Sequence, residues 1–146
     1  MPGRLLALDV GTRTVGLAIC DPERLLVRPL GTLARVGVRR DAAALAETAR
    51  AEGAVGLVVG LPLDERGAST RSTRLARQLG EALAEASGLP LAWTDERFST
   101  VEAARRLREQ GLSEREARSR IDAAAAAVIL EDFLASPGAG RFPPGA

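Results

Sequence analysis

The sequence predicts an α/β fold in which helices flank one five-stranded mixed sheet. Three observations carry this prediction: the order of the apolar runs, the turn residues between them, and a length of 146 residues with 46% hydrophobic residues. Such a length suits a single domain that can bury a real core. No apolar run approaches the ~20 residues of a membrane span, so we expect a soluble cytoplasmic protein that does not bind membranes.

The first quarter of the chain is expected to form three antiparallel strands. Two apolar runs, residues 5–10 and 15–20, flank a short loop that contains Gly11, a pattern typical of a β-hairpin. Asp21-Pro22 begins a second turn, and residues 25–33 supply the third strand.

The rest of the chain alternates helices with two short strands that favour parallel pairing. The expected elements are a helix over 39–53, a strand over 54–59, a helix from about Leu75 to Gly88, a strand over 89–93, and helices over about 99–110 and 114–135. This order matches the ribonuclease H-like fold and excludes a Rossmann fold, which needs a helix directly after the first strand. The Gly- and Pro-rich tail 137–146 is expected to be disordered, which leaves one domain over 1–136.

Composition excludes several classes of catalytic site. The chain has no His and one Cys, so a Ser-His-Asp triad, a thiolate zinc site and an internal disulfide are ruled out. Its 20 basic residues, all Arg, nearly balance 19 acidic residues, so net charge identifies no partner. Catalysis would have to come from carboxylates, Arg, hydroxyls, the backbone or a bound metal.

Acidic residues occupy three positions that need an explanation. Asp9 interrupts an apolar strand, and Asp122 lies at the edge of an apolar helical stripe. Asp95 and Glu96 end the last strand, where open α/β sheets present ligand groups, and either could point into a site. Asp9 could instead cap the hairpin turn, and Asp122 could pair with an Arg. Together the acids suit two Mg²⁺ or Mn²⁺ ions, which promote phosphodiester hydrolysis.

Four motifs in register resemble the YqgF family of RuvX-like nucleases, over about residues 4–134. They are Asp9-Val10-Gly11-Thr12-Arg13, Val59-Gly60-Leu61-Pro62, Asp95-Glu96-Arg97-Phe98-Ser99-Thr100 and Asp122-Ala123-Ala124-Ala125-Ala126. The resemblance implies a ribonuclease H-like fold and a divalent metal, with Asp9, Glu96 and Asp122 as catalytic and metal-binding residues. It is the resemblance that selects Glu96 over Asp95.

The family is described both as pre-16S rRNA processing nucleases and as Holliday junction resolvase homologues. The resemblance therefore implies phosphodiester hydrolysis, with the 5′ end of pre-16S rRNA as the favoured target. Resolution of Holliday junctions in DNA and a non-catalytic nucleic-acid-binding module are the alternatives, and a kinase-like ATPase is a weaker one. RuvC-type resolvases carry two acids three residues apart on the last helix, whereas Ser119 and Ala125 stand at those positions around Asp122.

The segment from Arg66 to Arg77 holds four Arg and no acid, which favours phosphate binding at a helix N-terminus. An ordinary solvated helix face with a Ser or Thr cap would show the same pattern. Arg residues between 105 and 120 are interleaved with Glu and are discounted. Expected nucleic-acid contacts are Arg13, Ser69, Thr70, Arg71, Arg74 and Arg97. The expected partner is structured RNA or branched DNA, bound by a monomer or homodimer.

Overall fold

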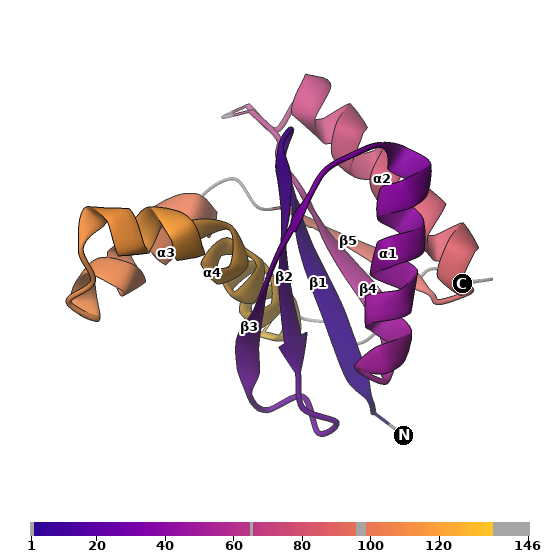
Figure 1. Ribbon diagram of the computed structural model, residues 1–146, viewed down its shortest axis with the longest axis horizontal. Coiled ribbons are helices and arrows are strands. Elements are labelled where there is room, and N and C mark those ends of the chain that lie inside the picture. The colour runs from indigo at the N-terminus through magenta and orange to yellow at the C-terminus, as the bar shows by residue number, and fades with distance from the viewer. Residues whose placement is uncertain (1, 65, 96–98, 136–146) are drawn as a thin grey trace.

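Five strands form one mixed sheet with the order β3-β2-β1-β4-β5 (Figure 1). The computed structural model describes residues 2–64, 66–95 and 99–135, and the predicted tail 137–146 lies outside them. The elements are β1 (Arg4–Val10), β2 (Thr14–Cys20), β3 (Val27–Ala34), α1 (Val38–Ala51), β4 (Ala54–Leu61), α2 (Arg71–Ser87), β5 (Leu91–Asp95), α3 (Ser99–Glu109) and α4 (Glu114–Ala135).

The strand pairing confirms the predicted division of the sheet. β1, β2 and β3 pair antiparallel, whereas β4 pairs parallel with both β1 and β5. The third strand begins at Val27 instead of residue 25 because the carboxylate of Asp21 accepts hydrogen bonds from the amides of Leu25 and Leu26, at 2.7 and 2.8 Å. These bonds hold both residues in the turn and leave their side chains exposed.

Helices cover both faces of the sheet because side chains alternate along each strand. On one face Leu6 and Leu8 of β1 pack with residues of α1 and α2. On the other face Leu5 and Ala7 pack against α4, around Ile129. The prediction of a ribonuclease H-like sheet with helices on both sides is therefore confirmed.

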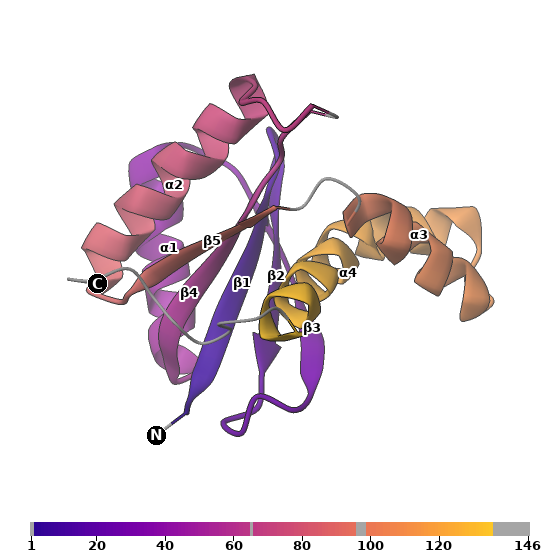
Figure 2. The same ribbon diagram turned by 180° about the vertical axis from the view of Figure 1, so that it is seen from behind.

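The α3–α4 hairpin extends from the side of the sheet (Figures 1 and 2). The second half of α4 lies on the sheet, and α3 packs against α4 through a small apolar cluster around Ala103, Ala125 and Val128. Across the described ranges, no helix is long and apolar enough to span a membrane.

Candidate functional site

The candidate acids meet at one edge of the sheet. Because β1, β4 and β5 are parallel, their carboxyl ends lie at the same edge, where β2 also begins. Asp9 is the second-last residue of β1, and Asp95 is the last residue of β5. This edge is where open α/β sheets bind ligands.

Gly16 brings α4 into contact with this edge. Gly16 pairs with Asp9 across the β1–β2 hairpin, so the two residues are direct neighbours on the sheet. A Cβ atom added to Gly16 would lie 2.0 Å from the backbone oxygen of Asp122, a distance that no side chain tolerates. Only glycine permits this approach, and it places Asp122 beside the strand pair that carries Asp9.

A threonine positions the carboxylate of Asp122. The hydroxyl of Thr14 donates a hydrogen bond to Oδ2 of Asp122. Thr14 lies two residues before Gly16, on the same face of β2, and both Thr14 and Asp122 are half-buried. In the sequence, Thr14 is marked only by its place at the end of the Gly-containing hairpin loop, which does not by itself indicate a partner on α4.

Asp95 does not share a face with Asp9 and Asp122. Its neighbour Trp93 packs with the cluster under α1 and α2, whereas Ala92 packs with the cluster under α4. Alternation therefore assigns Asp95, which pairs with Leu61 of the first cluster, to the face opposite α4. Glu96 and Arg97 lie outside the described residues, so their predicted roles stay predictions.

The donor chemistry at this edge suits a hard divalent cation. Asp9 and Asp122 supply carboxylate oxygens, which Mg²⁺ and Mn²⁺ prefer. Within residues 2–64, 66–95 and 99–135, no cluster of three or more His, Cys, Asp or Glu could hold a metal ion. A third carboxylate would have to come from outside those ranges, where Glu96 stands.

A buried ion pair fastens the hairpin loop next to Asp9. Nε of Arg35 donates to Oδ2 of Asp41 at 3.1 Å, and Nη1 donates to the carbonyl oxygen of Gly11 at 3.2 Å. The backbone amide of Arg35 donates to the carbonyl oxygen of Arg13 at 2.8 Å. The side chains of Arg35 and Asp41 are 10% and 1% exposed, so the loop is tied to the start of α1 through a desolvated contact.

Asp41 is ionised despite its burial. Burial raises the pKa of Asp41, but hydrogen bonds from the amides of Val36 and Gly37 and from the Arg35 side chain outweigh it, so the pKa falls below its usual value. The charge on Asp41 is thus maintained at neutral pH and keeps Arg35 oriented toward Gly11.

The first turn of α2 presents two exposed arginines. Thr70 is the N-cap residue of α2 and forms a capping box with Thr73. The Thr70 hydroxyl accepts a hydrogen bond from the amide of Thr73, and the Thr73 hydroxyl accepts one from the amide of Thr70. These hydroxyls therefore stabilise the helix start. Arg71 and Arg74 are exposed, and neither makes an ion pair within the described part of the chain. The guanidinium of Arg77 instead lies over Trp93, 5.5 Å from the ring centre.

The remaining predicted contacts lie at the same edge of the sheet. Arg13 is exposed in the loop that follows Asp9, and Ser69 is exposed directly before the α2 cap. The structure thus brings Arg13, Ser69, Thr70, Arg71 and Arg74 to the edge that carries Asp9 and Asp122.

Comparison with known proteins gives the same family at the level of sequence. Residues 3–136 match the family model described as "RuvX: Holliday junction resolvase". A "Putative pre-16S rRNA nuclease" of Anaeromyxobacter sp. (strain Fw109-5) is 48% identical over 132 residues, which cover 90% of this chain and 96% of the relative. The protein of the same name in Koribacter versatilis (strain Ellin345) is 42% identical and covers 97% of this chain and 93% of the relative.

Solved structures support the fold. The structure "T. thermophilus RuvC in complex with Holliday junction substrate" is 21% identical with a TM-score of 0.56, over 90% of this chain and 94% of that chain. The large terminase nuclease from thermophilic phage G20c is 11% identical with a TM-score of 0.53, over 88% and 81% of the two chains. From the family match across nearly all of the described residues, together with a sheet that places Asp9 beside Asp122, it follows that this chain belongs to the RuvX family.

Proposed function

We propose that this protein is a metal-dependent nuclease that hydrolyses phosphodiester bonds of pre-16S rRNA, at the 5′ end of the mature sequence. The observation that carries the proposal is the juxtaposition of Asp9 and Asp122 through Gly16, in a chain whose curated relatives carry the name of a pre-16S rRNA nuclease. Half-buried carboxylates are costly unless an opposite charge compensates them, and a divalent cation between Asp9 and Asp122 would do so.

In this proposal Asp9, Glu96 and Asp122 hold two Mg²⁺ or Mn²⁺ ions. Bound divalent ions would lower the pKa of water and stabilise the leaving oxygen. The hydrogen bond from Thr14 fixes one oxygen of Asp122, which leaves the other oxygen available for coordination. Arg13, Arg71, Arg74 and Arg97 would contact phosphates on either side of the cleaved bond, with Ser69 and Thr70 near them. Such contacts recognise the backbone and carry little sequence preference.

Substitution of the acids tests the proposal. Asp9→Asn, Glu96→Gln and Asp122→Asn keep the side-chain shape and remove one charge each, and each should abolish most cleavage of 5′-extended pre-16S rRNA. Glu85→Gln is the matched control, because Glu85 is exposed on α2, which packs on the face opposite α4. A variant that cuts at the parental rate identifies a residue that is not a ligand.

Thermal melts provide a readout besides activity. Metal that binds the folded state stabilises it, so Mn²⁺ should raise the melting temperature of the parent and raise that of the three variants less. Without metal, neutralising one of several crowded carboxylates should leave stability unchanged or improved. Equal stabilisation of all four proteins by Mn²⁺ would contradict the ligand set.

Resolution of Holliday junctions is the second candidate, favoured by the description of the family model and by the likeness of the fold to RuvC. Ser119 and Ala125 flank Asp122 at the positions where a further helix acid would stand, which favours RNA processing. Parallel assays on pre-16S rRNA and on a four-way DNA junction, with the same Mn²⁺ supply, distinguish the two. A parent that binds both substrates and cuts neither would be a non-catalytic module.

A further inference from the structure

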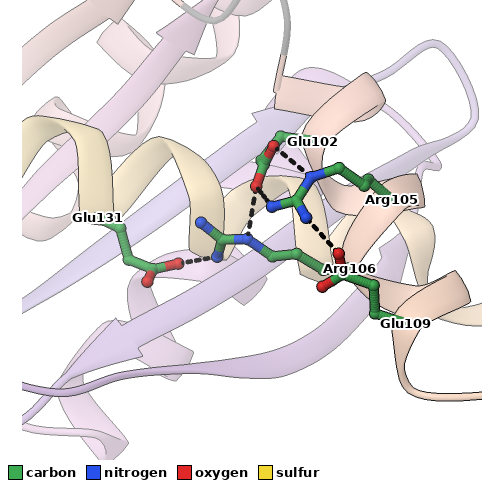
Figure 3. Close-up of polar contacts among 5 residues, drawn as sticks. All are labelled: Glu102, Arg105, Arg106, Glu109 and Glu131. Carbon is green, nitrogen blue, oxygen red and sulfur yellow. Dashed lines mark hydrogen bonds and ion pairs between the residues drawn. The ribbon is translucent and has the colours of Figure 1, made fainter.

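The α3–α4 hairpin carries arginines that the sequence pattern pairs with glutamates, but the structure pairs only some of them. Arg105 contacts both Glu102 and Glu109, and Arg106 joins Glu102 to Glu131 of α4 (Figure 3). Figure 3 shows that these five side chains form one connected network between the two helices. The acids of the network are thereby used within the hairpin.

Another acid of the hairpin caps α4. The carboxylate of Glu116 accepts from the amide of Ser113 at 3.1 Å, and the amide of Glu116 donates to the Ser113 hydroxyl at 3.2 Å. The side chains of Arg115 and Arg118 are exposed, and neither makes an ion pair or a side-chain hydrogen bond in the part of the chain that the structure describes. Within those residues, the positive charges of Arg115 and Arg118 are therefore left without a partner.

These two arginines lie on the same face of α4 as Asp122. At 3.6 residues per turn, Arg115 and Arg118 differ from Asp122 by only about 20° and 40° around the helix axis. Along the axis, Arg118 lies about 6 Å and Arg115 about 10 Å before Asp122. Consecutive phosphates of a nucleic-acid strand are spaced about 3.4 Å along a duplex axis, so the row spans roughly three of them. A cationic row thus leads directly to the carboxylate that Thr14 positions.

The row lies on the other side of the sheet edge from Arg71 and Arg74. α2 packs on one face of the sheet and α4 on the other, and Figures 1 and 2 show the start of α2 and the α3–α4 hairpin on opposite sides of that edge. Asp9 and Asp122 therefore stand between two exposed pairs of arginines.

We propose that Arg115 and Arg118 form a second phosphate-contact surface, so that the nucleic-acid substrate spans the carboxylates from α2 to the α3–α4 hairpin. The inference rests on the proposed function and adds that the substrate continues past Asp122 along α4. Phosphate contacts release condensed counterions, so this surface makes a measurable contribution to the salt dependence of binding.

The test compares binding of RNA by the parent and by an Arg115→Ala/Arg118→Ala double variant, in chelator and over a range of salt concentrations. The double variant should bind unrelated RNA sequences more weakly. The negative slope of the logarithm of the binding constant against the logarithm of the salt concentration should become shallower by roughly two units, one for each lost contact. An Arg115→Lys/Arg118→Lys variant should keep most of the parental slope, because Lys also binds phosphate as a point charge.

The matched control is Arg28→Ala/Arg50→Ala, which removes the same charge at the opposite edge of the sheet, from exposed positions at the start of β3 and the end of α1. Its slope should equal that of the parent. The inference is overturned if the α4 double variant keeps the salt dependence of the parent, or if the control loses as much salt dependence as the α4 variant. In either case, cleavage of RNA by the parent would leave the proposed function intact. A parent that neither binds RNA nor cuts it with Mn²⁺ overturns both.

Discussion

Arginine–carboxylate contacts fasten two regions beside the candidate site, and the two differ mainly in burial. The Arg35–Asp41 pair ties the β1–β2 loop to α1, and its side chains are 10% and 1% exposed. The pairs of Arg106 with Glu102 and Glu131 tie α3 to α4, with side chains that are 34–42% exposed. Both regions use an arginine guanidinium and a carboxylate, whereas their exposure to solvent differs.

A lowered carboxyl pKa indicates a larger contribution to stability in the buried region than in the exposed one. Hydrogen bonds from Arg105 and Arg106 lower the pKa of Glu102 to about 2, yet the carboxylate lies in water where salt screens its partners. The pKa of Asp41 is lowered against an opposing effect of burial, by bonds that water cannot replace. The buried pair should therefore contribute more to stability, even though the exposed network has more ion pairs.

Loss of Arg35 should have the largest effect. Arg35→Ala would leave Asp41 buried with only the amides of Val36 and Gly37 as donors, and the cost of breaking a buried pair is about 3–5 kcal/mol. Urea unfolding followed by circular dichroism measures this loss. Arg50→Ala, which removes an exposed partner of Glu47, is the control and should stay within about 0.5 kcal/mol of the parent. Equal losses in the two variants would break the contrast between the regions.

Acid titration should separate the two regions next. Because the folded-state pKa of Asp41 is below the unfolded value of about 3.9, its contribution is complete above that pH and is lost as pH falls through the folded-state pKa. Asp41→Asn should therefore lower stability at pH 7 and flatten the decline below about pH 4. Midpoints of urea unfolding between pH 2 and 7 test this. A variant whose stability decreases at low pH as steeply as that of the parent would contradict it.

The same experiment at about 1 M salt sharpens the comparison. The folded-state pKa of Glu102, about 2, also lies below its unfolded value, so its contribution is present at neutral pH and is lost as pH falls toward 2. High salt should remove this part of the acid decline and leave the part due to Asp41, because buried pairs are screened much less.

Arg106→Ala should have a moderate effect on stability. Arg106 is the residue that joins α3 to α4, and exposed pairs of this kind contribute about 0.2–1 kcal/mol each. The loss should shrink as salt is raised from 0.05 to about 1 M, whereas the loss in Arg35→Ala should not. A salt-independent loss would show that Arg106 acts through the packing of its apolar stem instead.

The sequence was sufficient to predict features that repeat along the chain. Alternation and continuous apolar runs predicted the order of helices and strands along the chain, and the apolar stripe of α4 singled out Asp122. It was insufficient for contacts between distant segments, such as Thr14 with Asp122, which are 108 residues apart. The Arg35–Asp41 pair could not be predicted for a different reason. The two residues are six positions apart, between a strand end and a helix start, and this spacing belongs to no periodic pattern.

The arginines of the α3–α4 hairpin show how far composition can mislead. Their interleaving with glutamates along the sequence predicts that the charges neutralise one another within the hairpin. Pairing depends on helix phase. Among the residues that the structure describes, Arg105 and Arg106 reach acids, whereas the side chains of Arg115 and Arg118 do not. Net charge over a segment therefore conceals which cations remain available to a partner.

The smallest effects should come from the outermost part of the network, where the order of the charges matters. Glu102 precedes Arg105 and Arg106 on α3, the order that the helix dipole favours, whereas Glu109 follows Arg105 in the unfavourable order. Glu109→Ala should leave stability within a few tenths of a kcal/mol of the parent, because it removes one exposed contact of an arginine that keeps Glu102. Glu102→Ala should cost more, since it removes contacts to two arginines at once. A double-mutant cycle between Arg105 and Glu109 measures the coupling directly, and a value near that of a buried pair would show that exposure does not govern these contacts.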